Sequence, residues 1–223
     1  MPRTETATSA PTRRARDAAR PGPPPTVLVR PGDEPTAATL LAAAVEVMAA
    51  SGYHGTSVRD IATAAGTSPA VLYHHYRSKQ GLLVMLCDRG LDVLIEATEA
   101  ALDEAGPDDA DKLRAIVGAH VRVHMESQRE SLIGNSEIRA LEAPGRDLIV
   151  AKRDAQQRFF DRVVRDGVRS GAFATPQPDD ASRFITTACT GVAAWYRPGG
   201  ATEADEIVAR HQRIALDAVA HRP

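Results

Sequence analysis

The chain has 223 residues, of which 43% are hydrophobic and 25% charged, and a formal net charge of −2. These are ordinary values for a water-soluble protein with one sizeable core. No apolar run approaches the roughly 18 residues of a membrane span, and the polar start lacks a signal-peptide core. We therefore expect a cytoplasmic protein without a membrane partner, and its two cysteines, Cys87 and Cys189, fit a reducing compartment.

Helix-forming residues dominate the sequence, and no segment alternates as a strand would, so the predicted class is all-α with about nine helices. We divide the chain into a tail over residues 1–35, a head over residues 36–80 and a body over residues 81–223. Lys and Arg exceed Asp and Glu by 6 to 4 in the tail and by 3 to 2 in the head, whereas the body carries 18 against 23. This asymmetry is expected if only the amino-terminal part meets nucleic acid.

Residues 1–35 hold most of the prolines and little that could pack, which predicts a disordered tail. Its basic cluster of Arg13, Arg14 and Arg16 can follow phosphates or enter a minor groove. The alternative is a solvated tail without a fixed partner.

The head begins with two helices. Apolar residues recur at helical spacing from Thr36, and Gly52 can end that helix in a left-handed conformation. Ser57 caps the second helix, and Asp60 three positions later completes a capping box. Gly66 then breaks the second helix.

Ser68 and Pro69 are the cap and the first residue of a short third helix, and Ser78 caps a long fourth helix. Two short helices joined by a tight glycine turn are typical of a helix-turn-helix, which presents its second helix to the DNA major groove. Five more helices are predicted in the body: 110–130, 132–142, 145–170, 179–196 and 203–220.

The second helix of this unit can contact DNA in two ways. The small residues Pro69 and Ala70 allow a close approach to the groove, where Ala70 can touch a thymine methyl group. Hydroxyl, imidazole and ammonium groups can donate to phosphate oxygens. The residues that supply them are Ser57, Thr67, Tyr73, His74 and Lys79.

The stretch GYHGTSVRDIATAAGTSPAVLYHHYRSKQGLL resembles the head of the TetR family of bacterial transcriptional repressors almost position by position. The resemblance covers residues 36–85, with Met48 and Gly81 as minor departures, and implies a DNA-binding regulator. The DNA contacts that we expect are Ser57, Thr67, Ser68, Pro69, Ala70, Tyr73, His74, Tyr76 and Lys79.

One recognition helix reads too few base pairs to be selective, so we expect a homodimer on a palindromic operator of double-stranded DNA. Two apolar stripes in the last two helices suit an interface, and the resemblance implies that these helices pair with their symmetry mates as a four-helix bundle. The alternative is that both stripes are buried within the monomer. The stripes are Phe184, Ile185, Ala188, Val192 and Trp195, and Ile207, His211, Ile214 and Ala218.

The segment TACTGVAAWYRPGGATEADEIVARH resembles a subgroup of TetR-type repressors that control lipid and steroid breakdown and release DNA on binding acyl-CoA thioesters. Cationic groups for the CoA phosphates would be Lys152 and Arg153, with Arg158 beside them. Apolar groups for the acyl part would be Met125, Phe159, Phe160, Cys189 and Trp195. The alternative for each is an ordinary place in the core or on a solvated helix face.

His120 and His124 have the spacing of metal ligands on one helix face, but no third ligand follows, so a pocket or core role is preferred and no metal is expected. No cofactor motif or catalytic constellation is present, which argues against an enzyme. A TetR-type sensor of hydrophobic drugs, controlling an efflux or metabolic gene, remains the alternative function. As a bacterial DNA-binding regulator, the protein should associate with the nucleoid.

Overall fold

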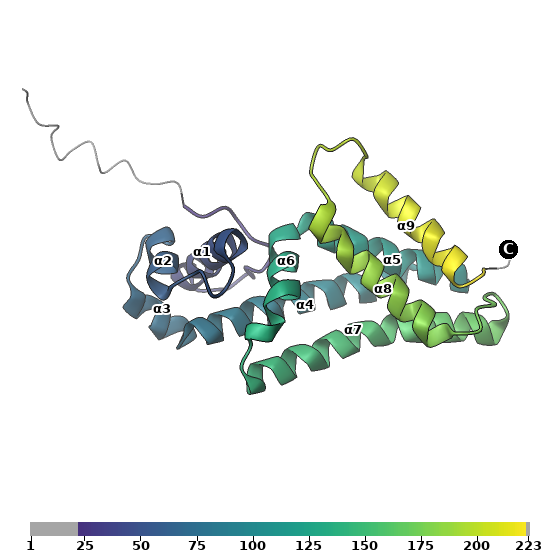
Figure 1. The fold of residues 1–223 in the computed structure, drawn as a ribbon, viewed down its shortest axis with the longest axis horizontal. Helices are drawn as coiled ribbons and strands as arrows, with labels where there is room; N and C mark the ends of the chain where they lie inside the picture. The colour runs from purple at the N-terminus through teal and green to yellow at the C-terminus, as the bar shows by residue number, and fades with distance from the viewer. Residues whose placement is uncertain (1–21, 222–223) are drawn as a thin grey trace, which may run out of the picture.

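The computed structural model of the chain describes residues 22–221, and within them it forms nine α-helices, one 3-10 helix and no strand. The predicted all-α class is confirmed. Figure 1 shows an elongated molecule, with the first three helices at one end and the C-terminus at the other. The elements are α1 (Pro35–Ser51), α2 (Val58–Ala64), α3 (Pro69–Tyr76), α4 (Lys79–Glu104), α5 (Asp109–Glu126), α6 (Gln128–Ser136), the 3-10 helix η2 (Glu137–Ala140), α7 (Ala143–Ser170), α8 (Pro178–Trp195) and α9 (Ala204–Ala218).

Local signals set the boundaries of the head helices. The Ser57 hydroxyl accepts from the Asp60 N–H, while the Asp60 carboxylate accepts from the Ser57 N–H, so the predicted capping box is confirmed. Gly66 has φ +67°, which favours glycine and permits the tight turn before α3. Pro69 is the first residue of α3, where its missing N–H leaves no hydrogen bond unmade.

The helix α4 joins the head to the body. Its first half contributes Leu82, Leu83 and Leu86 to the apolar cluster of the head. That cluster continues across the predicted boundary at residue 80, because Ile133 and Ile149 from the body belong to it. The same helix also packs against α5 and α7 of the body.

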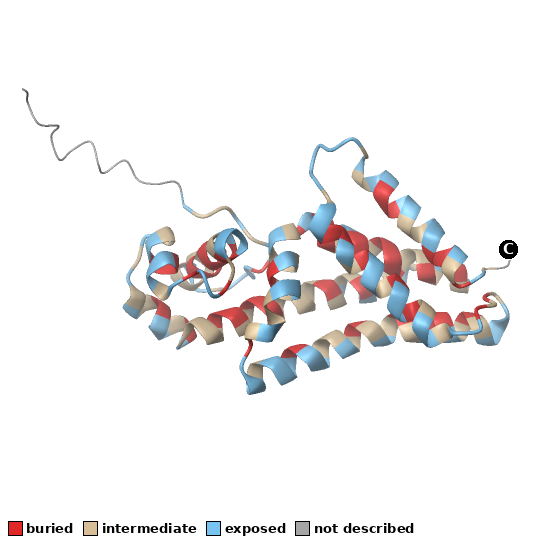
Figure 2. Cartoon of the chain, in the orientation of Figure 1, coloured by how far each residue is buried: buried red, intermediate tan, exposed pale blue. Residues whose placement is uncertain are grey.

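The body is organised around α5, which packs against α4, α7, α8 and α9. Its core includes Phe160 and Ile116, both fully buried, and Phe173 from the α7–α8 connection. Figure 2 shows the buried positions running along the inner faces of these helices. No helix within residues 22–221 is both long and apolar enough to cross a membrane.

The prediction of a disordered tail over residues 1–35 is wrong for its described part. Leu28 is 1% exposed, and its carbonyl accepts from the Arg89 guanidinium of α4 at 2.9 Å. Arg89 also pairs with Asp33, and the Thr26 hydroxyl donates to Glu130 of α6. Residues 26–33 therefore lie against α4 and α6. The basic cluster at residues 13–16 falls outside the described residues.

The predicted helices over 110–130 and 132–142 also differ from the structure. The break falls at Ser127, whose φ of −108° and ψ of 46° are not helical. Gln128 then begins α6, and its side-chain amide donates to the carbonyls of Ala193 and Tyr196 at the end of α8. The turn is thus fixed by a distant helix rather than by a local breaker.

Candidate nucleic-acid interface and internal cavity

The outer face of α3 presents polar and small side chains to solvent. Ser68, Ala70 and His74 are exposed, and Tyr73 is 52% exposed, while Leu72 is fully buried behind them. The Ser68 hydroxyl makes no capping hydrogen bond. The short helix is thus held from behind with its face open, the arrangement that a recognition helix requires.

Tyr76 does not belong to that face, which corrects one predicted DNA contact. Its side chain is buried, and its hydroxyl donates to the Ala37 carbonyl of α1 at 2.7 Å. Burial raises the pKa of Tyr76 to about 12. Tyr76 therefore holds α3 against α1 and has no free donor for a phosphate.

Lys79 and Ser57 have internal partners as well. The Lys79 ammonium donates to the carbonyls of Tyr53 and Thr56 at 2.9 and 2.7 Å and lies 4.0 Å from the centroid of the Tyr53 ring. Ser57 is exposed but engaged in its capping box. Both can reach DNA only with the hydrogen-bonding capacity that remains.

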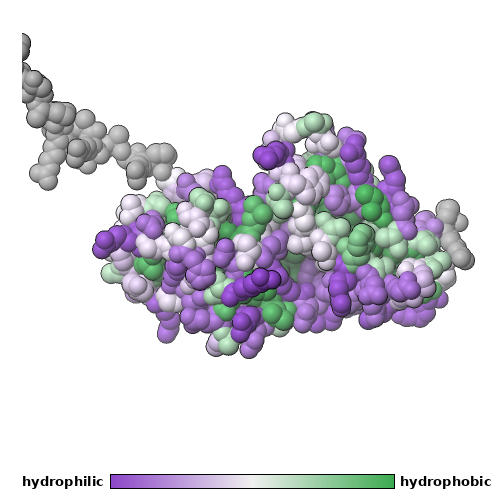
Figure 3. All heavy atoms as spheres, in the orientation of Figure 1, coloured by the Kyte–Doolittle hydropathy of each residue, from purple (hydrophilic) through white to green (hydrophobic). Residues whose placement is uncertain are grey.

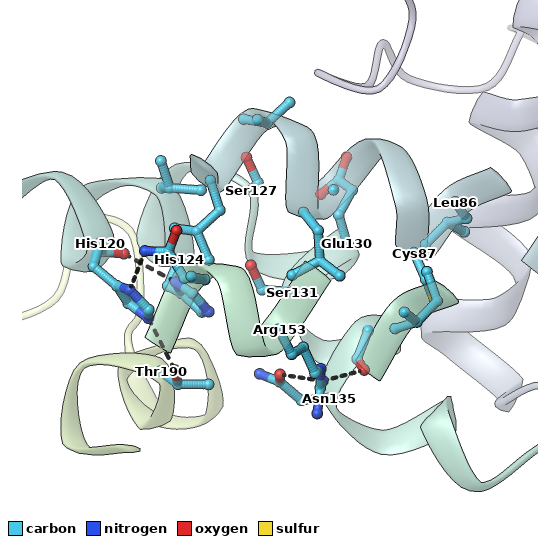
Figure 4. Close-up of a pocket in the computed structure, with 18 of the residues that line it drawn as sticks. Leu86, Cys87, His120, His124, Ser127, Glu130, Ser131, Asn135, Arg153 and Thr190 are labelled. Atoms are coloured by element: carbon cyan, nitrogen blue, oxygen red, sulfur yellow. Dashed lines mark hydrogen bonds between the residues drawn. The ribbon is translucent and has the colours of Figure 1, made fainter. Parts of the chain in front are cut away.

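A cavity of about 290 Å³ lies in the body. It is bounded by α4, α5, α6, α7 and α8, and by Val27 and Leu28 of the amino-terminal segment (Figure 4). Its apolar wall comes mainly from α4, with Leu86, Leu91 and Leu94. Its volume is at the lower end of the range of small-molecule pockets.

Of the seven predicted ligand-binding residues, only Arg153 lines this cavity. The neighbouring Lys152 forms ion pairs with Asp88 and Asp92 of α4. Successive residues of a helix point about 100° apart, and the ion pairs of Lys152 with α4 turn its side chain away from the cavity that Arg153 lines. The exposed Arg158 is not among the lining residues either.

The other five predicted residues lie elsewhere, which corrects the prediction. Met125, Phe160 and Cys189 are buried in the core of the body, and Phe159 is half-buried beside Arg162. Trp195 is more than half exposed and stacks on His211 of α9, with 6.0 Å between the ring centroids. Apolar periodicity identified residues that pack, but could not distinguish the core from the cavity wall.

The Arg153 guanidinium donates to the Gly134 carbonyl at 2.7 Å and to the Asn135 side chain at 3.2 Å. Within residues 22–221 no carboxylate lies within ion-pair distance of it. Burial disfavours its charged form and lowers its pKa. A largely desolvated cation without a counter-ion favours an anionic or strongly accepting group on a ligand.

His120 and His124 form one polar end of the cavity. Their rings are stacked, with centroids 4.5 Å apart, and both side chains are buried. Burial lowers the pKa of both imidazoles, and that of His120 falls well below its usual value. Both are therefore neutral near pH 7.

The spacing of the two histidines was the available sequence signal for this end of the cavity, and their preferred pocket or core role is confirmed. Gln156 of α7 and Thr190 of α8 complete it and carried no signal. No group of three His, Cys, Asp or Glu side chains that could hold a metal ion occurs among residues 22–221.

The predicted stripes of α8 and α9 divide between the core and the surface. Ile185, Val192 and Ile207 are buried within the protomer. Phe184, Trp195 and Ile214 are exposed over 61%, 54% and 56% of their surfaces. Figure 3, in the orientation of Figure 1, shows apolar side chains at the surface where α8 and α9 lie. Large exposed side chains gathered on neighbouring helices indicate an interaction surface.

Comparison with known proteins accounts for both parts of the molecule. Residues 40–86 match the family model "Bacterial regulatory proteins, tetR family", and residues 106–219 match "Tetracyclin repressor-like, C-terminal domain". The transcriptional repressor KstR2 of Rhodococcus jostii is 30% identical over 81% of this chain and 89% of its own length. The transcriptional activator FasR of Mycolicibacterium smegmatis is 28% identical over 82% and 83%.

Solved structures agree with this assignment of the fold. A tetR-family regulatory protein from Rhodococcus RHA1 has a TM-score of 0.80 and 30% identity, covering 85% of this chain and all of its own. AibR, in complex with isovaleryl coenzyme A and operator DNA, has a TM-score of 0.75 and 21% identity over 84% of this chain and all of its own. The second likeness concerns the fold alone.

Proposed function

This chain belongs to the TetR family of bacterial transcriptional regulators, and we propose that it is a homodimeric repressor released from a palindromic operator by an acyl-CoA thioester of lipid or steroid catabolism. It is a DNA-binding regulator rather than an enzyme. An operator-binding protein acts where the DNA is, so we place it in the bacterial cytoplasm, at the nucleoid.

The proposed DNA contacts are the exposed residues of α3 and its turn. Ser68, Ala70 and Tyr73 reach base edges or the adjacent backbone, and His74 reaches phosphates. Thr67 and Pro69 are half-buried at the amino end of the same helix, where backbone N–H groups attract phosphate. Lys79 and Ser57 can form further hydrogen bonds to DNA only with the donors and acceptors that their internal hydrogen bonds leave free.

We place the dimer interface on α8 and α9. Phe184, Trp195 and Ile214 give an apolar surface that a twofold-related copy can cover with the same residues. Two heads related by that axis read two half-sites about 34–36 Å apart.

The effector half of the proposal depends on one observation: the cavity in the body is lined by α4, the helix that also packs into the head. A cavity of about 290 Å³ can enclose an acyl group but not the nucleotide of coenzyme A. Arg153 is the one cation among its lining residues and suits the thioester carbonyl or the first anionic groups beyond it. The complex of AibR with isovaleryl coenzyme A supports this class of ligand.

Release follows if the ligand favours a different position of α4. Leu86 belongs to the head cluster and also lines the cavity, so displacement of the cavity wall moves the base of the head. A preference of a few kcal/mol for one position is sufficient. We choose repression because KstR2 is named a repressor, although FasR is an activator.

The test is a gel-shift titration of the full-length protein on its own promoter fragment. Acyl-CoA thioesters of increasing chain length should lower operator affinity, and the corresponding free acids should act more weakly. Equal operator affinity with and without every thioester would contradict the effector assignment.

A sensor of hydrophobic drugs is the second candidate, favoured by the apolar α4 wall and the neutral histidines. If the protein is such a sensor, uncharged drugs should release it from the operator and acyl-CoA thioesters should leave its operator affinity unchanged.

A further inference from the structure

A chain of hydrogen bonds at the polar end of the cavity begins at Thr98. Its hydroxyl donates to the Leu94 carbonyl at 2.8 Å, so its oxygen can only accept. The Gln156 amide nitrogen lies 2.8 Å from that oxygen and donates to it. The same nitrogen is 3.4 Å from His120 Nδ1, to which its second hydrogen can be donated.

With the Gln156 amide oriented as in the structure, these contacts assign the proton of His120 to one ring nitrogen. Nδ1 accepts and burial keeps the ring neutral, so the proton lies on Nε2. His120 Nε2 is 2.9 Å from the Thr190 hydroxyl oxygen and donates to it. The hydroxyl hydrogen of Thr190 then finds no acceptor within residues 22–221, and Thr190 lines the cavity.

One polar atom of Gln156 stays unsatisfied in this order. Its Oε1 is the one fully buried side-chain oxygen or nitrogen of the described chain that has no hydrogen-bond partner. The amide thus uses its donors on Thr98 and His120 and leaves its acceptor unsatisfied. The network holds His120 in one tautomer even though this leaves a buried polar atom unpaired.

His124 supplies the opposite function. Its Nδ1 is 2.9 Å from the His120 carbonyl, an oxygen that can only accept, so the proton of the neutral ring lies on Nδ1. Nε2 therefore carries a bare lone pair, and no partner for it is found within residues 22–221. Figure 4 shows His120, His124 and Thr190 together, with Arg153 and Asn135 on the side toward Cys87.

We propose that His124 and Thr190 form a subsite for a neutral hydroxyl group, so that the effector is an apolar molecule bearing an alcohol where it reaches α5 and α8. This inference rests on the proposed use of the cavity as the effector site. A hydroxyl accepts from Thr190 and donates to His124, whereas a methyl group satisfies neither. A ketone lacks the donor, and a carboxylate would face the lone pair of His124.

The test measures the affinity of the full-length protein by calorimetry. The probes are hexanoyl-, octanoyl- and decanoyl-CoA and their ω-hydroxy derivatives. At the chain length that fits best, the hydroxylated thioester should bind about tenfold tighter, as two net hydrogen bonds provide. Thr190→Val and His124→Phe should each remove most of this preference.

Thr187→Val is the matched control, since Thr187 lines the cavity from the same helix but lies outside the network. It should retain the preference, and thermal melting establishes that each variant is folded. Equal affinity for plain and hydroxylated thioesters would overturn the subsite and leave the acyl-CoA proposal intact.

Absence of binding by all thioesters would instead reject the proposed effector class. The subsite is then tested with octan-1-ol and decan-1-ol against their methyl ethers, which accept but do not donate. Tighter binding of the alcohols, lost in Thr190→Val, supports the subsite, and equal binding overturns it.

Discussion

Tyr73 and Tyr76 lie three positions apart on α3 but have different surroundings. Tyr73 is more than half exposed, while Tyr76 is buried and its hydroxyl donates a hydrogen bond to the Ala37 carbonyl of α1. We expect Tyr73→Ala to weaken operator binding by about 1–3 kcal/mol and to leave stability unchanged. Fluorescence anisotropy on the operator and thermal melting measure the two effects.

Tyr76→Phe is the matched control on the same helix. It should lower the free energy of unfolding by about 1 kcal/mol, through the lost hydrogen bond to Ala37, with little effect on operator affinity. Operator binding by Tyr73→Ala at the wild-type level would remove Tyr73 from the proposed contacts.

The buried histidines predict a pH-dependent stability. The pKa values of His120 and His124 are lowered in the folded protein, so unfolding binds protons below the usual value of 6.5. The free energy of unfolding should fall as the pH drops from about 6.5 to about 5.5, by at most about 1.4 kcal/mol per pH unit for each histidine.

Urea titrations across that range measure this slope. His120→Gln should reduce it, whereas His54→Gln, at an exposed position, should not. The Asp33–Arg89 pair does not interfere, because the pKa of Asp33 is lowered from 3.8 to about 2 on folding, and both values lie below this window. A slope unchanged in His120→Gln would contradict the assignment.

Prediction from sequence succeeded for residues whose role is local. Ser57 and Asp60 are three positions apart, and Pro69 acts through its own ring, so their functions can be identified without the fold. Thr190 and Gln156 acquire theirs by meeting His120 from two other helices. Contacts between side chains on different helices cannot be identified from a single sequence.

At the scale of elements, residues 22–34 are the main surprise. Proline-rich composition indicated disorder, but one apolar side chain and the carbonyls and carboxylates around it bind α4. Arg89, the residue that holds this segment, is 61 positions from Leu28 in sequence. Such a contact depends on the fold and has no local pattern.

Leu28→Ala tests whether this segment contributes to stability. Because Leu28 is fully buried against α4 and the cavity, we expect a loss of about 2 kcal/mol in the free energy of unfolding, at the low end for core truncations because the segment is at the surface. Chemical denaturation measures it. Val29→Ala, at an exposed neighbour, should change stability by less than about 0.5 kcal/mol.

A wild-type denaturation midpoint in Leu28→Ala would show that the segment is not held in solution.

The helices themselves were predicted well where caps and glycine turns lie at their ends. The break at Ser127 was misplaced because Gln128 is held by the end of α8.

At the scale of the whole molecule, the head and the cavity are parts of one packed unit. The apolar cluster of the head includes Ile133 and Ile149, and Ile149 also lines the cavity. A change in the cavity can therefore reach the head through α7 as well as through α4.

The proposed dimer interface on α8 and α9 can be tested by placing charges in it. Phe184 and Ile214 are exposed in the protomer, so replacing both with Glu costs the monomer little but places charges in the proposed interface. We expect Phe184→Glu/Ile214→Glu to sediment as a folded monomer. Because paired half-sites bind with an avidity of about 10²–10⁴ over one, its operator affinity should fall by about 100-fold or more.

Leu148→Glu provides the control for this double substitution, since Leu148 is exposed on α7, away from the α8–α9 face. It should remain a dimer with wild-type operator affinity. A double variant that stays dimeric would place the interface elsewhere. A monomer that binds the full operator as tightly as the wild type would show that the two half-sites do not need a twofold protein, because a single α3 would then account for all of the selectivity.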